Sequence, residues 1–492
     1  MLIRKYLDQN APSLQDFEQL IESYKLEYGV ILLRDYKKLL KIYNTTEMSL
    51  NEFKIHTNYI LQYIWEKLHT GHWKNVHICW RILYSSIKLL IVLYYLYKSN
   101  EFNNHVDDDD PNSYHLDLDL DHNHDHHHDH HNSYHPFIEL IKELDLSLIM
   151  GYPIFNQFAS KLASKLHHII MMKTKLCNED YLSSRLFQLD NHDHNDNDHD
   201  NIDRFIQINE EIKINLNKLD RINCPSIELF NHLIKLNKPF IITNAINFWP
   251  AYNNNNNNNN NHINNKCKWT LNYWLINYGY RLVPIEIGKK YTEENWGQKL
   301  MTINDFINYY FNPSIINNNH NENTIKIGYL AQYDIFKQIP ELENDIYIPD
   351  YCYVTGENEQ INNNDINTIE TNIWFGPKNT ISPLHHDNDR ANLLTQINGY
   401  KLIILYSSLE TNNLYPYFDN MLCNTSRIDL DNNIDFNKFP KFKNAHGYYS
   451  ILKHGEMLYI PPRCWHYVRS LTASYSVNFW WNISSSLIPA WE

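Results

Sequence analysis

Apolar residues are spaced differently in the two halves of the chain. In the first 230 residues they recur at intervals of three and four, so that Ile60, Ile64 and Leu68 fall on one helical face. Only three glycines and five prolines interrupt this part. The spacing predicts an all-α region, with helices over 58–68, 80–97, 137–149 and 155–172.

After Lys238 the pattern changes to short β-rich runs separated by turn residues, and nine of the twelve glycines lie in this part. Several short strands with regular turns are typical of a sandwich or barrel. One or two helices, around 272–277 and 303–310, are expected to precede the barrel. The predicted strands cover 239–243, 282–287, 372–375, 402–406, 457–460 and 474–481.

Low-complexity tracts interrupt both halves. They are rich in Asp, His or Asn and cannot bury apolar area, so we expect disordered loops at about 101–135 and 188–204 and Asn-rich insertions in the second half. The His/Asp tract could also bind metal adventitiously. The tracts cover 121–131, 190–200, 253–261, 317–323 and 362–364.

The net charge of −14 arises from two of these tracts. Residues 104–135 contain nine aspartates, residues 190–203 contain six, and neither stretch has a lysine or arginine. The remainder of the chain is therefore close to neutral and has no basic stripe, so direct nucleic-acid binding is not expected. Lys438, Lys441 and Lys443 are too sparse to predict a nuclear import signal.

Glycine and cysteine positions exclude several classes of site. No two glycines lie closer than Gly447 and Gly455, which excludes the G-x-G-x-x-G turn and the G-x-x-x-x-G-K phosphate loop. The seven scattered cysteines form no C-x-x-C pair and fit free thiols in a reducing compartment. The first ten residues lack a signal-peptide core, and the apolar run 89–97 is short for a bilayer. We therefore expect a soluble intracellular protein without membrane contact.

The segment from Ser382 to Asp389 contains the most informative polar residues. If it is a strand, His385 and Asp387 point to one face. His466, which follows a predicted strand, could supply a third ligand. Two histidines and one carboxylate form the facial triad of non-haem Fe(II) oxygenases, which leaves metal positions open. The alternative is a polar surface turn, because H-x-D triplets also occur in the low-complexity tracts.

Lys401 opens the apolar run 402–405. A lysine that points into a barrel is costly unless it meets an anion, such as the distal carboxylate of 2-oxoglutarate. An exposed lysine at a strand edge is the alternative.

The stretch from about Lys238 to Trp481 resembles the JmjC family of Fe(II)- and 2-oxoglutarate-dependent oxygenases. The blocks occur in the family's order, and residues 65–71 also resemble a helical N-terminal region found in that family. The blocks are 283–288, 291–296, 328–332, 338–342, 348–351, 374–377, 381–385, 439–442, 465–468 and 479–481.

The resemblance implies an α+β protein with a helical region over 1–230 and a JmjC double-stranded β-helix, a cupin-like barrel, over 236–492. It matches His385, Asp387 and His466 to the iron ligands, with no catalytic residue beyond them. The residues matched to 2-oxoglutarate binding are Tyr329, Ser382, Asn392 and Lys401, with Trp480 as a pocket wall. Asn392 requires one inserted residue after Asp387, which a β-bulge would accommodate, and Trp480 could equally be a core aromatic.

The resemblance also implies a protein substrate. Glu286, Tyr291, Trp296 and Trp374 match residues on the substrate side, where a carboxylate and aromatic faces suit a guanidinium group. Packing over the barrel mouth, or a surface charge for Glu286, is the alternative. The implied activities are arginyl hydroxylation or histone lysine demethylation, in the nucleus or cytoplasm; an inactive binding module is a third possibility. The sequence predicts no oligomeric state.

Overall fold

In the computed structural model the chain forms two compact units. One comprises Met1–Glu179 and Asn277–Leu282, and the other comprises Asp180–Ile276 and Val283–Glu492. The structure describes residues 2–44, 50–72, 75–98, 135–177, 213, 215–252, 269–311, 327–356, 368–418 and 422–490. The predicted loops and Asn-rich insertions lie almost entirely outside these residues.

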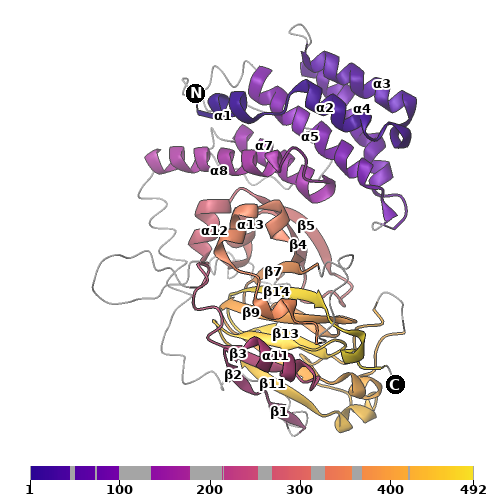
Figure 1. The fold of residues 1–492 in the computed structure, drawn as a ribbon, viewed down its shortest axis with the longest axis vertical. Coiled ribbons are helices and arrows are strands. Elements are labelled where there is room, and N and C mark those ends of the chain that lie inside the picture. The colour runs from indigo at the N-terminus through magenta and orange to yellow at the C-terminus, as the bar shows by residue number, and fades with distance from the viewer. Residues whose placement is uncertain are drawn as a thin grey trace. The chain divides into compact units, whose positions relative to one another are not determined.

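The first unit is helical, as the apolar spacing predicts (Figure 1). Its central helix α5 is buried along most of its length, and the other helices pack their apolar faces into one core that includes Leu39, Ile64, Leu90 and Leu162. The elements are α1 (Leu2–Asn10), α2 (Leu14–Glu22), α3 (Lys25–Asn44), α4 (Leu50–Leu68), α5 (Ile78–Lys98), α7 (His135–Leu146), a π-turn (Ser147–Gly151) and α8 (Phe158–Cys177).

Helix α5 is the one helix among the described residues that is long and apolar enough to cross a membrane. However, 83% of the relevant stretch, Ile78–Tyr97, is buried inside its own unit. Its apolarity is therefore accounted for by its place in the core, because a helix that is hydrophobic on all sides can be the centre of a protein interior.

The second unit contains two β-sheets, and Figure 1 labels several of their strands. The smaller sheet has the order β1-β11-β10-β13-β8, and the larger has the order β2-β3-β12-β9-β14-β7-β6-β4-β5. The smaller sheet comprises β1 (Leu216–Lys218), β8 (Ile381–His385), β10 (Lys401–Tyr406), β11 (Gly447–Leu452) and β13 (Trp465–Ser470). The larger comprises β2 (Arg221–Asn223), β3 (Phe240–Thr243), β4 (Leu282–Ile287), β5 (Gly297–Thr302), β6 (Gly328–Tyr333), β7 (Glu370–Gly376), β9 (Arg390–Asn398), β12 (Met457–Ile460) and β14 (Ser474–Asn482).

An apolar cluster joins the two sheets. Ile403 and Leu405 from β10 pack with Leu394 from β9 and Leu458 from β12. These side chains belong to different sheets, so the sheets face each other across a shared core, as in a sandwich of two layers. The two sheets do not close into a continuous barrel.

Short helices accompany the sheets: α11 (Ile227–Ile234), α12 (Leu271–Tyr278), α13 (Ile303–Phe311) and α15 (Ile335–Gln338). Helix α11 begins at Ser226, whose side chain accepts a hydrogen bond from the Leu229 backbone. Helices α12 and α13 lie where the sequence predicts them. A helical region followed by a cupin-like pair of sheets confirms the predicted fold class.

Candidate metal centre and pocket

Two histidines lie opposite each other on neighbouring strands of the smaller sheet. His385 ends β8 and His466 is the second residue of β13, and the antiparallel register makes them direct partners. Their ring centroids are 4.2 Å apart. Both side chains are largely buried, and their rings lie next to each other.

Asp387 completes the cluster from outside the strand. Strand β8 stops at His385, so the expected shared strand face for His385 and Asp387 does not form. The carboxylate nevertheless lies 3.8 Å from His385 Nε2 and 3.6 Å from His466 Nε2. Ligand atoms of the three residues lie within 4.8 Å of one another, which is compact enough to hold one metal ion.

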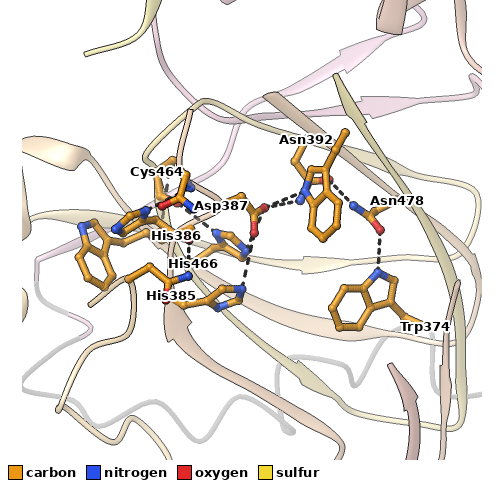
Figure 2. A network of polar contacts seen from close by, with 12 residues as sticks. Trp374, His385, His386, Asp387, Asn392, Cys464, His466 and Asn478 are labelled. Carbon is orange, nitrogen blue, oxygen red and sulfur yellow. Dashed lines mark hydrogen bonds and ion pairs between the residues drawn. The ribbon is translucent and has the colours of Figure 1, made fainter. Parts of the chain in front are cut away.

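Backbone carbonyl groups determine which ring nitrogens face the cluster (Figure 2). His385 Nδ1 lies 2.7 Å from Pro383 O, and His466 Nδ1 lies 3.0 Å from Cys464 O. Because a carbonyl oxygen only accepts, each Nδ1 carries the proton and each Nε2 keeps its lone pair. This tautomer suits metal binding, and such carbonyl contacts orient metal-bound histidines.

The electrostatic environment keeps His385 and Asp387 in their metal-binding forms. Burial and the nearby His466 lower the pKa of His385 to about 4, so its ring is neutral near pH 7. Burial by itself would raise the pKa of Asp387, but the two histidines and two hydrogen bonds outweigh it, and the pKa lies below its usual value. Two imidazoles and one carboxylate are the donor set of a non-haem iron site.

Two side chains hold the carboxylate in place. Asn392 Nδ2 donates to Asp387 Oδ2 at 2.7 Å and Trp480 Nε1 donates to the same oxygen at 3.0 Å. Arg390 stacks on the Trp480 ring, with its Cζ atom 4.6 Å from the centroid. Asp387 Oδ1 receives neither of these hydrogen bonds, so it is the better placed oxygen for a metal.

The residue inserted before Asn392 lies in a turn. Asn388 has φ of 57° and Asp389 follows it before β9 begins. Strand β9 then pairs regularly with β14 from Arg390 to Gln396, so the β-bulge expected there does not form. Asn and Asp tolerate left-handed backbone because their short polar side chains bond locally.

A pocket opens beside the cluster. It includes all three cluster residues and all five residues matched to co-substrate binding: Tyr329, Ser382, Asn392, Lys401 and Trp480. Residues from both sheets therefore line one pocket.

Lys401 is the only lysine or arginine in this pocket lining, and 1% of its surface is exposed. Its Nζ atom lies 3.4 Å from the Tyr329 hydroxyl, and burial lowers the pKa of Lys401 to about 7. The exposed strand-edge alternative is therefore wrong. A buried ammonium group at the wall of a pocket is a suitable partner for a carboxylate of a bound ligand.

Of the four residues matched to the substrate side, only Trp374 belongs to the lining of this pocket. Tyr291 packs edge-on against His385 with centroids 6.4 Å apart, and Trp296 Nε1 donates to Glu286 Oε2 at 3.3 Å. Burial raises the pKa of Glu286 and raises the pKa of Tyr291 to about 12.

Asn478 is a site residue that sequence reasoning missed. It accepts from Trp374 Nε1 at 2.8 Å and donates to Asn392 Oδ1 at 3.2 Å, which links the pocket wall to the residue holding Asp387 (Figure 2). The signal for it is the alternation of Ser474, Ser476 and Asn478 with large apolar residues along β14. Buried polar side chains need hydrogen-bond partners, so this alternation predicts one polar face along the buried strand.

Comparisons with known proteins agree with this geometry. A family model described as a cupin-like domain matches residues 226–486. The chain is 35% identical over 425 residues to Lysine-specific demethylase 8 of Danio rerio, covering 86% of each chain. It is 33% identical over 477 residues to JmjC domain-containing protein D of Dictyostelium discoideum, covering 94% of this chain and 95% of that one.

A third relative matches over a shorter length. The chain is 38% identical over 267 residues to Jumonji C domain-containing protein 5 of Drosophila melanogaster, covering 54% of this chain and 59% of that protein. The family match, the near full-length relatives and the His-Asp-His cluster agree with one another. The chain belongs to the JmjC family of cupin-like oxygenases, which depend on Fe(II) and 2-oxoglutarate.

Proposed function

We propose that this enzyme hydroxylates an arginine side chain in a protein substrate. The observation that carries the proposal is the carboxylate of Glu286, which pairs across strands β4 and β6 with the pocket-lining residue Tyr329. Among the described residues its hydrogen bond comes from Trp296 alone, and burial raises its pKa. A partly buried carboxylate with spare acceptor positions favours a cationic side chain.

The surrounding aromatic residues favour a planar cation. Trp296 is adjacent to Glu286, Trp374 lies 5.9 Å from the Tyr329 ring, and Tyr291 lies next to His385. A guanidinium group can accept a bidentate carboxylate and stack on aromatic faces, which an ammonium group does less well. The arginine methylene groups would then lie towards the metal cluster.

The donor set of the cluster fits iron. His385, Asp387 and His466 would hold Fe(II), and Lys401, with Tyr329, Ser382 and Asn392 beside it, would hold 2-oxoglutarate. Bound iron supplies the oxidising chemistry, in which O₂ and 2-oxoglutarate are converted to succinate and CO₂ while a C–H bond of the substrate is hydroxylated. The chain itself orients the three ligands, neutralises the co-substrate's distal carboxylate and positions the target side chain. No separate general base is required.

Histone lysine demethylation by the same site is the second candidate. The observation that favours it is the name of the relative in Danio rerio, Lysine-specific demethylase 8. Hydroxylation of an N-methyl group would release formaldehyde, and the same metal and co-substrate residues would serve. Glu286 and its aromatic neighbours suit a guanidinium group better than an ammonium group, so we propose arginine as the first candidate substrate. For either substrate we predict a nuclear or cytoplasmic location.

The test is succinate release from 2-oxoglutarate by the Fe(II)-loaded protein, with arginine peptides and methyl-lysine peptides in parallel. We expect product mass spectra to show one added oxygen on arginine, and His385→Ala to abolish turnover. Loss of a methyl group from lysine with formaldehyde release would instead assign demethylation. Equal succinate release by wild type and His385→Ala would contradict both and favour the binding-module alternative.

A further inference from the structure

A buried lysine lies one residue before Tyr291 and has no part in the chemistry proposed above. Lys290 donates to Asp429 Oδ2, and its Nζ atom lies 3.4 Å from Asp431 Oδ2. The side chains of Lys290 and Asp431 are 5% and 1% exposed. Ion pairs at the surface contribute little, whereas breaking a buried one leaves an uncompensated charge. The Lys290–Asp431 pair is buried on both sides and is therefore costly to break, whereas the side chain of Asp429 is 40% exposed.

Lys290 belongs to a compact loop that we call the substrate-side loop, residues 288–296. Glu293 N donates to Lys290 O, and Trp296 N donates to Glu293 O, both at 3.1 Å. Two consecutive turns thus connect Lys290 to Trp296, whose indole donates to Glu286. Lys290, Tyr291 and Trp296 therefore belong to one hydrogen-bonded loop.

The partners of Lys290 belong to a second stretch, the anchor segment, residues 424–431. Its first residues run beside the end of β8. His386 N donates to Asn424 O at 3.0 Å, Asn424 Nδ2 donates to His386 O at 2.9 Å, and Ser426 N donates to Leu384 O at 2.8 Å. The anchor segment is therefore hydrogen-bonded to both residues that flank the metal-cluster histidine His385.

The far end of the anchor segment is tied to the other histidine strand. Asp431 Oδ1 accepts from the Tyr467 hydroxyl at 2.7 Å and lies 3.5 Å from Arg469 Nη1. Tyr467 and Arg469 belong to β13, which also carries His466. Asp431 thus connects Lys290 to the strand that supplies the third cluster residue.

The two segments also meet near the metal cluster. The Tyr291 hydroxyl and Thr425 Oγ1 are 3.1 Å apart, and Thr425 pairs with His385 as an isolated β-bridge. Tyr291 is consequently held from two sides, by its own hydroxyl and by the neighbouring Lys290. These two contacts connect the substrate-side loop to the metal cluster.

We infer that Lys290, through its ion pairs with Asp429 and Asp431, is a positioning residue that fixes the substrate-side loop at the metal cluster and thereby determines substrate affinity. This inference rests on the proposed function, because it assigns Tyr291, Trp296 and Glu286 to the substrate. Of the co-substrate residues, only Ser382 lies on a strand that the anchor segment contacts, namely β8. Tyr329, Asn392, Lys401 and Trp480 lie on other strands, so we expect the ion pairs to affect protein-substrate binding and to leave 2-oxoglutarate binding unchanged.

The experiment compares Lys290→Met with Lys289→Met and Lys290→Arg in the full chain. Lys289 is the matched control, because it is the adjacent lysine and no ion pair joins it to the described residues. The probe is N-acetyl-arginine amide, the smallest peptide-like guanidinium, and its stimulation of succinate release is measured together with 2-oxoglutarate affinity. Hydrogen exchange of the amides in 288–296 is measured in parallel.

We expect Lys290→Met to raise the half-saturating concentration of the probe about tenfold, as for a modest displacement of positioning groups. Exchange of the Glu293 and Trp296 amides should accelerate, and Lys290→Arg should restore both properties. Lys289→Met should behave as wild type, and 2-oxoglutarate affinity should be the same in all variants.

Two results separate this inference from the proposed function. Suppose that the wild type releases succinate, and that Lys290→Met leaves both the probe response and the amide exchange unchanged. This result would leave the proposed function intact and overturn the positioning role. A parallel loss of 2-oxoglutarate affinity in Lys290→Met would also overturn it, because the effect would then be a general loss of structure. Absence of succinate release by the wild type, with normal loop exchange, would count against the proposed function.

Discussion

At the scale of single residues, Lys401 makes the pocket sensitive to pH. Burial lowers the pKa of Lys401 to about 7, so the ammonium form dominates below that pH and the neutral amine above it. A bound dicarboxylate needs the ammonium form. We predict that 2-oxoglutarate affinity is constant below about pH 7 and falls about tenfold per pH unit above it.

Calorimetric titration of 2-oxoglutarate into Mn(II)-loaded protein, from about pH 6 to about pH 9, measures this. Lys401→Arg is the control, because a guanidinium stays charged throughout and should remove the pH dependence. A wild-type affinity that does not change over this range would show that Lys401 is not the carboxylate partner.

Trp480 has two possible roles, a pocket residue that holds a metal ligand or a core aromatic. Its indole N–H donates to Asp387 Oδ2 at 3.0 Å. We predict that Trp480→Phe weakens metal binding about tenfold, as expected when a hydrogen bond to a metal ligand is lost. Trp481→Phe is the matched control for Trp480→Phe, because Trp481 is also buried but its indole donates to Val354 O and not to a metal ligand. Co(II) titration followed by absorbance measures both, and equal affinities would contradict the role of Trp480.

At the scale of elements, the turn between β8 and β9 contains Asp387 and is hydrogen-bonded to the segment that leads into β13, the strand of His466. Asn388 has φ of 57° and its carbonyl accepts from Arg463 N at 2.7 Å, two residues before β13. We predict that Asn388→Val lowers the free energy of unfolding by about 1–2 kcal/mol, because a β-branched residue is strained in left-handed backbone. Asn388→Gly, which keeps the conformation, should be close to neutral. Urea unfolding measures the difference, and equal stability of the two variants would contradict it.

Elements with strong local patterns were predictable from the sequence. The runs 282–287 and 457–460 coincide with β4 and β12 because alternation and turn residues are local signals. Helix α8 begins at Phe158 rather than 155, since Phe155, Asn156 and Gln157 all have positive φ, which apolar spacing does not reveal.

The candidate site was predictable in composition but not in arrangement. The residue types of the cluster follow from motifs, whereas the pairing of His385 with His466 depends on strand register, which sequence spacing leaves open. The same limit applies to Lys290, because its partners Asp429 and Asp431 are 139 and 141 positions further along the chain. Contacts of that kind are set by the tertiary fold.

At the scale of the whole molecule, the helical unit includes a short segment from far along the chain. Arg281, within Asn277–Leu282, binds Asp145 although 136 positions separate them. Both side chains are fully buried, and Leu282 N donates to the same carboxylate at 2.7 Å. The boundaries at 230 and 236 were predicted from the change in composition. Composition does not reveal that the segment Asn277–Leu282 returns to the helical unit.

The Arg281–Asp145 pair provides the last prediction. Arg281→Met leaves a buried carboxylate without its cation, so we expect the free energy of unfolding to fall by about 3–5 kcal/mol. Combining it with Asp145→Leu removes the stranded charge, so the double variant should be more stable than Arg281→Met alone. The exposed pair Lys337–Asp334 is the control, and Lys337→Met should cost about 0.5 kcal/mol or less. Denaturant unfolding of the four proteins measures these differences; a double variant no more stable than Arg281→Met would show that shape, and not charge pairing, is what this contact supplies.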